Sequence, residues 1–239
     1  MKWLRRKPTI ITAVGLVVVL AVAATLWNVS GSRTFQFFGE LVNRVETTEK
    51  VVALTFDDGP DPAGAQQVLD LLDQERVKAT FFLIGRDLEK HPELGRKIAD
   101  AGHEIGNHTY HHERMVGVLP STVAGEIEDT DAQIRRTGYT GEIHFRPPNG
   151  KKLFALPHYL SEHHRKTIMW DVEPDSAGTP TAAQIEQDVL DRTRPGSIIL
   201  LHPMYASRDQ TRQALKPVIG ELKERGYRFV TVSALLAGA

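Results

Sequence analysis

Five short segments of this chain carry the side chains that a metal-dependent hydrolase of amides or esters requires. Between them they hold two adjacent carboxylates, several imidazoles, an arginine and a further carboxylate. Such a set can bind a divalent metal, take a proton from a water molecule and protonate a leaving group. The segments are residues 55–60, 108–112, 146–150, 170–175 and 200–202.

Asp57 and Asp58 follow an apolar run and precede a Gly-Pro pair that forces a turn. Adjacent side chains point in different directions from an extended backbone. One carboxylate of the pair therefore suits a metal while the other faces a substrate. Asp-Asp-Gly-Pro alone is more typical of a plain turn or a helix N-cap, and its position directly after an apolar strand favours the functional role.

His108 and His112 are four residues apart, a spacing that on a helical turn brings both rings to one side. We therefore choose them, over the intervening His111, as ligands of a metal shared with one of the two aspartates. Three ligands leave positions for water and a substrate oxygen. The chain has no cysteine, so its ligands are N and O atoms, which favour Zn²⁺, with Co²⁺, Ni²⁺ or Mn²⁺ as alternatives. A surface loop rich in histidine is the structural alternative.

Arg146 precedes a stiff Pro-Pro turn. A guanidinium at this position can pair with Asp57 and keep that carboxylate ionised and aimed. The prolines also stiffen the backbone that follows, so we expect an N–H group near Asn149 to face a developing oxyanion. A structural arginine on a rigid turn is the alternative interpretation of this segment.

His202 ends the wholly apolar run of residues 198–201. Imidazole exchanges protons near neutral pH, so this position predicts a general acid. Asp175 would orient the ring or raise its pKa, and Leu200 would line a small acyl pocket. A core histidine with satisfied hydrogen bonds is the alternative.

Strand-like and helix-like segments alternate along the chain and must position these residues. Helices are predicted over residues 68–77, 92–101, 121–137, 181–194 and 217–225, with a capping box at Thr181–Gln184 and Pro217 in the first turn of the last helix. The alternation predicts parallel βαβ units. We expect an α/β fold, a deformed TIM-like (β/α)7 barrel, with a doubly wound open sheet as the alternative. The predicted strands are residues 51–56, 79–84, 103–107, 143–146, 167–172, 197–202 and 227–232.

Each polar segment falls at or just past the C-terminal end of a predicted strand. In a βα barrel these strand ends gather on one face, where active sites form. The five segments are therefore expected to meet at one site.

The N-terminal segment carries a membrane-targeting pattern. Lys2, Arg5, Arg6 and Lys7 precede the uncharged apolar residues 10–27, close to the length of ~20 residues that spans a bilayer. Positive charge before the span predicts that this end stays in the cytoplasm and the rest lies outside it. We expect a transmembrane anchor within residues 1–30, a connector over residues 31–49 and a catalytic domain over residues 50–239. A signal peptide cleaved near Ala23, giving a secreted protein, is the alternative.

Composition excludes one class of partner. The net charge is −1 and the pI is near 6.8, so no excess of basic charge indicates a nucleic-acid partner. All the basic bias lies in the N-terminal segment.

Together the five motifs resemble those of the NodB-homology polysaccharide deacetylases, carbohydrate esterase family 4, over residues 51–236. The resemblance implies that Asp57 is the base, that Asp58, His108 and His112 are the metal ligands, that Arg146 holds the base and that His202 is the acid. Two positions depart from the family pattern. Asn149 stands where an aromatic is usual, which keeps the backbone N–H but loses a ring, and Ser176 stands where a tryptophan usually follows Asp175.

The expected activity is metal-dependent removal of acetyl groups from N-acetylhexosamine units of a cell-envelope or related polysaccharide, with release of acetate. The candidates are peptidoglycan, a chitin-like oligomer or an exopolysaccharide. Hydrolysis of O-acetyl esters on a polysaccharide would use the same residues. A non-catalytic glycan-binding module is the alternative from a different functional class, and an amidohydrolase of small cyclic amides is a third.

Overall fold

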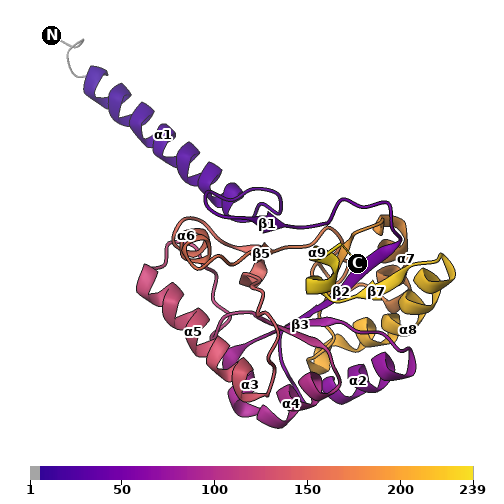
Figure 1. The fold of residues 1–239 in the computed structure, drawn as a ribbon. Helices are drawn as coiled ribbons and strands as arrows, with labels where there is room; N and C mark the ends of the chain where they lie inside the picture. The colour runs from indigo at the N-terminus through magenta and orange to yellow at the C-terminus, as the bar shows by residue number, and fades with distance from the viewer. Residues whose placement is uncertain (1–5, 239) are drawn as a thin grey trace.

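Strand β2 (Val51–Asp57) is the centre of the fold in the computed structural model, which describes residues 6–238 (Figure 1). It pairs in parallel with β3 (Thr80–Leu83), β6 (Ile198–Leu201) and β7 (Arg228–Val230). Every residue of β2 is buried, because a parallel strand inside an α/β fold is covered on both faces.

Parallel pairing continues around the fold beyond β3. The next strand, β4 (Glu104–Asn107), pairs with β3, and single parallel bridges extend the order through Phe145 to β5 (Thr167–Ile168), and from Val172 to β6. Since β6 pairs with β2, these bridges complete a path around the fold, which makes the arrangement barrel-like. These bridges join Asn107 to Phe145, Phe145 to Thr167, and Val172 to Ile199. The predicted strand over residues 143–146 is wrong, because only Phe145 forms a bridge there. The expected α/β architecture with parallel strands is confirmed.

Helices cover the outside of the strands (Figure 1). The predicted capping box at Thr181 is present, with its side chain accepting from the backbone N–H of Gln184. The predicted start of the last long helix at Pro217 is wrong. The helix begins at Asp209, and Pro217 lies in its interior. The helices after β2 are α2 (Ala65–Gln74), α3 (Gly85–Lys90), α4 (Pro92–Asp100), α5 (Pro120–Arg136), α6 (Ala155–Glu162), α7 (Ala182–Arg192), α8 (Asp209–Glu224) and α9 (Val232–Leu236).

Side chains of β2 alternate between two apolar clusters. Val52, Leu54 and Phe56 pack outward with side chains of α2 and α8. Val51 and Ala53 face inward with a second cluster that includes residues of β6. Because successive side chains of a strand point to opposite faces, Asp57 continues the inward row, at the C-terminal end of the strand.

The apolar N-terminal segment forms helix α1 (Arg6–Ser30), which projects away from the domain (Figure 1). Residues Thr12–Ser30 have a mean hydropathy of 2.1, and most of the stretch is exposed, with Ser30 buried at the end of the helix. The helix is thus long and apolar enough to cross a membrane. The predicted basic residues Lys2 and Arg5 lie outside the described residues.

Residues 31–49 lie against the rest of the fold. Their strand β1 (Leu41–Val42) pairs in parallel with β5. Further along, the Arg44 side chain donates to the carbonyl oxygen of Pro195. The segment therefore contributes backbone pairing and side-chain contacts to the fold.

Candidate active site

The C-terminal strand ends surround one cavity of about 410 Å³. Every candidate residue from the sequence lies in its wall or directly behind it. Arg146 and Asp175 are the two behind it, both almost completely buried. The cavity wall contains Asp57, Asp58, His108, His112, Asn149, Leu200 and His202.

Asp58, His108 and His112 form a cluster suited to a metal ion, with one ligand atom from each within 4.8 Å of the others. Asp58 Oδ1 lies 3.2 Å from His112 Nε2 and 3.8 Å from His108 Nε2. This oxygen is buried and has no hydrogen-bond partner within the described part of the chain. An orphaned carboxylate oxygen facing two imidazole nitrogens fits a divalent cation, because burying it unpaired would otherwise be costly.

A backbone carbonyl sets the orientation of the His108 ring. Nδ1 of His108 lies 2.8 Å from the carbonyl oxygen of Arg146, so Nδ1 carries the proton and Nε2 presents its lone pair to the cluster. Burial lowers the pKa of His108, although the charge of Asp57 opposes this shift. The neutral ring is the form that a metal requires.

The two histidines meet through a loop, so the helical turn that motivated their choice is wrong. Residues 108–112 are irregular, and Thr109 and His112 have φ values of 65° and 63°. The Thr109 hydroxyl accepts a hydrogen bond from the N–H of His112 and holds the turn. The intervening His111 points away and binds Glu126, with 2.6 Å between Nδ1 and Oε1.

Arg146 is completely buried and holds Asp57. Its Nη1 donates to Asp57 Oδ1 at 2.6 Å and to the Thr55 hydroxyl at 2.9 Å. Its other nitrogens donate to two backbone carbonyls, those of Ile168 and Met169, each at 3.2 Å. The second carboxylate oxygen, Asp57 Oδ2, lies 3.6 Å from His108 Nε2, on the cavity side. One oxygen is therefore fixed while the other faces the cluster.

His202 is paired with Asp175, as the sequence suggested. Asp175 Oδ1 lies 3.0 Å from His202 Nδ1, and Oδ2 accepts from the His202 backbone N–H at 2.8 Å. Burial alone would lower the pKa of His202, but the hydrogen bond and charge of Asp175 outweigh it and raise this pKa to about 9. Thr211 also donates to Asp175. Burial would raise the pKa of Asp175, yet these hydrogen bonds hold it below its ordinary value.

Asn149 and Leu200 lie in the cavity wall with Met169 and Trp170. Asn149 has a φ of 54° within a short 3₁₀ turn, Pro148–Gly150. Left-handed backbone suits asparagine better than most side chains, and it brings the loop backbone to the cavity. Ser176 lines the same cavity.

Sequence reasoning missed an ion pair in the cavity wall. Arg33 pairs with Glu173, and its guanidinium lies 4.8 Å from the centre of the Trp170 ring. Glu173 also accepts from Trp170 Nε1 at 2.8 Å. Glu173 lies inside a recognised motif and was visible in the sequence. Arg33 comes from the segment expected to be a connector, more than a hundred residues away, and no local signal could have found it.

Comparison with known proteins gives a consistent result. A family model described as polysaccharide deacetylase matches residues 44–167. A peptidoglycan-N-acetylglucosamine deacetylase from Bacillus cereus is 38% identical over 200 residues, covering 83% of this chain and 93% of that protein.

Two solved structures are similar over most of the chain. A peptidoglycan N-acetylglucosamine deacetylase superposes with a TM-score of 0.77 and 35% identity, covering 81% of this chain and 91% of the other. A family 4 acetyl xylan esterase from Clostridium thermocellum, in complex with a cobalt ion, gives a TM-score of 0.72 and 36% identity, covering 79% and 91%.

Proposed function

Since the chain belongs to the polysaccharide deacetylase family, as its motifs predicted, we propose that it removes acetyl groups from N-acetylhexosamine units of a cell-envelope glycan. Relatives named as peptidoglycan N-acetylglucosamine deacetylases support this substrate class. Chitin-like oligomers and exopolysaccharides contain the same acetamide group and remain alternative polymers.

One observation carries the proposal. A carboxylate held by a buried arginine and an imidazole held by a buried carboxylate line the same cavity as the Asp–His–His cluster. A base, an acid and a metal site around one cavity are the parts that amide hydrolysis needs.

Asp58, His108 and His112 would hold the divalent metal, for which Zn²⁺ is the expected ion. When bound there, the metal would supply Lewis-acid polarisation of the acetamide carbonyl and lower the pKa of a water molecule. The cobalt ion in the acetyl xylan esterase structure supports a divalent ion on this fold.

The other residues have separate roles in the proposed reaction. Asp57 takes the proton of the attacking water at Oδ2, because Oδ1 is engaged by Arg146. The backbone N–H of Asn149 faces the negative charge that develops on the acetyl oxygen. His202, kept protonated by Asp175, gives its proton to the leaving amine. Leu200 lines the pocket for the acetyl methyl group.

The test is acetate release by the full-length protein from peptidoglycan glycan strands and from chitooligosaccharides. Release should stop on chelation and return with zinc. Asp57→Asn should abolish release while bound metal, measured by mass spectrometry, is retained. His112→Ala should lose the metal, whereas the matched control His111→Ala should keep both metal and activity, because His111 faces Glu126. Full activity of Asp57→Asn would show that the base is another residue.

A second activity has one specific observation in its favour. The acetyl xylan esterase of similar structure is named as hydrolysing an O-acetyl ester, and the same residues would serve an ester substrate. Acetylated xylan belongs in the same assay, and a faster rate on it than on the glycan amides would select the esterase. Glycan binding without acetate release, unaffected by chelation, would indicate a non-catalytic module.

The proposed location is the outer side of a cell membrane, with α1 as a single-pass anchor and the catalytic domain, residues 50–239, outside the cytoplasm. The exposed apolar surface of Thr12–Ser30 and the basic residues before it support this topology. Cleavage near Ala23 and secretion is the alternative. Mass measurement of the mature N-terminus decides between them.

A further inference from the structure

Five large apolar side chains outside α1 are exposed, and no others among residues 31–238 are exposed to this degree. Their exposed fractions range from 41% to 69%. Scattered exposed side chains of this kind are normal, but a contiguous group indicates an interaction surface. The five are Phe35, Phe37, Phe38, Leu119 and Phe154.

The four phenylalanines form one continuous surface, and Leu119 adjoins it through its neighbour Pro120; the five side chains are here called the aromatic patch. The ring centroids of Phe35 and Phe37 are 5.3 Å apart, and those of Phe37 and Phe154 are 4.7 Å apart. Phe38 and Phe154 then line a shared apolar groove with Pro120, the neighbour of Leu119. Three segments distant in sequence thus converge on a single apolar face.

The aromatic patch is continuous with the end of α1. The Lys151 ammonium lies 4.2 Å from the centre of the Trp27 ring and donates to the Trp27 carbonyl oxygen. Lys152, with 1% of its surface exposed, donates through its ammonium to the Ser32 carbonyl oxygen at 2.6 Å. These contacts fix the end of α1 to the loop that leads into Phe154.

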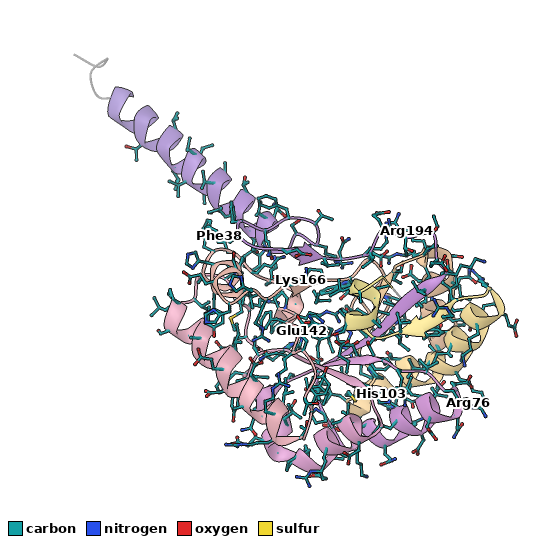
Figure 2. All side chains as sticks on the ribbon, in the orientation of Figure 1. Phe38, Arg76, His103, Glu142, Lys166 and Arg194 are labelled. Atoms are coloured by element: carbon teal, nitrogen blue, oxygen red, sulfur yellow. The ribbon has the colours of Figure 1, made fainter. Side chains whose placement is uncertain are left out.

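The figures show the same proximity. Helix α6 lies beside the end of α1 in Figure 1, and Phe38 is labelled in that region in Figure 2. Arg76 is labelled at the far side of the domain. Phe38 and α6 therefore lie at the end of the domain from which α1 projects.

From this continuity we propose that the aromatic patch is a membrane-contact surface, which seats the domain on the bilayer that α1 crosses. The span ends at Ser30 and Phe35 follows after a short segment, residues 31–34, which places the patch near the level of the membrane interface. Phenylalanine and leucine on an apolar face, with Lys or Arg beside it, are typical of surfaces that lie in the membrane interface. The proposal rests on the proposed anchoring of α1.

A glycan accounts less well for the patch as a whole. The groove beside Phe38 and Phe154 also has polar side chains, His158, Tyr159 and Glu162. Phe35, Phe37 and Leu119 lie outside that groove and carry no hydrogen-bonding groups, and the Phe37 ring packs on Phe154. A lipid surface needs apolar area with cations beside it. Lys151 provides such a cation at the junction with α1, where its ammonium lies against the Trp27 ring.

The contact has a consequence for catalysis. Gly31, Arg33 and Lys151 belong both to the junction with α1 and to the wall of the catalytic cavity. With the patch on the bilayer, the cavity opens next to the membrane surface. The protein then acts on the glycan nearest the membrane.

Because the chain has no cysteine, single-cysteine variants of the full-length protein can carry a nitroxide label at chosen positions. Leu119→Cys and Phe154→Cys report on the patch, and Val18→Cys on α1. Arg96→Cys, on the exposed side of α4, is the matched control. In lipid nanodiscs, collision with oxygen and with chromium oxalate, measured by electron paramagnetic resonance, distinguishes lipid from water.

Labels at residues 18, 119 and 154 should collide with chromium oxalate several-fold less than the label at residue 96, and more with oxygen. Adding Phe35→Glu and Phe37→Glu to Leu119→Cys should return that label to the water-exposed values. The proposal would be overturned if the label at residue 18 lay in lipid while the labels at residues 119 and 154 were exposed to water. A water-exposed label at residue 18 would overturn it as well.

Two other occupants give distinct results, and either would also overturn the proposal. Dipolar broadening between labels at residue 119 would mean that a second copy covers the patch. Protection at residue 119 in detergent, produced only on adding chitooligosaccharide, would mean that the patch binds glycan. Acetate release from soluble chitooligosaccharide by the same variants is unaffected by the patch, so it reports on the proposed activity separately.

Discussion

Replacing Asp175 with asparagine should lower the pKa of His202, the proposed acid, and so reduce the pH range in which it is protonated. In the structure burial lowers the pKa of His202, but the hydrogen bond and charge of Asp175, with smaller effects of Asp57 and Asp58, raise it to about 9, against an ordinary value of 6.5. This difference corresponds to about 3 kcal/mol in favour of the imidazolium form. Asparagine keeps the shape but loses the charge, and burial then favours the neutral ring. The pKa of His202 should fall to its ordinary value or below.

The assay is the pH dependence of kcat for acetate release, measured from pH 5 to 10. In the proposed reaction His202 acts as an acid, so kcat should decline as the pH rises above the pKa of His202. In Asp175→Asn this basic limb should move down by about two pH units or more. Thr211→Val is the matched control, because it removes one hydrogen bond from the same carboxylate and leaves the charge. A limb that stays in place in Asp175→Asn would refute the acid role of His202.

The same pair links stability to pH. Because the pKa of His202 is raised in the folded state, its contribution to the free energy of unfolding is complete below about 6.5 and is lost as the pH rises through about 9. Urea unfolding should therefore show that wild type is more stable than Asp175→Asn at pH 6. The difference in the free energy of unfolding between the two proteins should be smaller at pH 10. An equal difference at both values would contradict the linkage.

Three further substitutions test parts of the fold and site. Arg146→Met leaves Asp57 buried without its partner and should reduce the free energy of unfolding by about 3–5 kcal/mol, measured by urea unfolding; a loss below 1 kcal/mol would contradict the pairing. Arg33→Gln should raise KM several-fold with little change in kcat, because Arg33 lines the cavity away from the base and acid; a fall in kcat alone would assign it a role in the chemistry. Thr181→Ala removes the capping box of α7 and should cost about 1 kcal/mol in thermal unfolding, with activity at 25 °C unchanged.

Local patterns were sufficient for most elements. The short β-branched runs and the Thr181–Gln184 capping box predicted strands and a helix start that the structure contains. The predicted helix start at Pro217 was wrong, because proline favours the first helical turn when only the sequence is considered. In the structure the flanking residues of α8 are buried in the core, and their packing outweighs the cost of an interior proline, roughly 3 kcal/mol.

The histidine pair was chosen for a geometric reason that does not apply. Four-residue spacing suggested a helical turn, yet the rings meet across an irregular loop with left-handed backbone at Thr109 and His112. The Thr109 side chain and contacts with neighbouring elements hold that loop, including a hydrogen bond from the Gly85 N–H to the Thr109 carbonyl oxygen. Such a conformation depends on partners distant in sequence, which a spacing rule does not include.

The sequence by itself determined the chemical inventory and the face on which it would gather. Polar residues at C-terminal strand ends must meet when the strands are parallel, because the pairing aligns those ends. Only the tertiary structure decided which carboxylate oxygen of Asp57 accepts the hydrogen bond from Arg146. It also decided that Asp175 pairs with His202 and favours its protonated form, and that Arg33 completes the cavity wall. The physical reason is the separation along the chain of the residues that each feature depends on. Strand direction and side-chain alternation are set by neighbouring residues, whereas buried polar pairs need desolvation and alignment that only the packed chain provides.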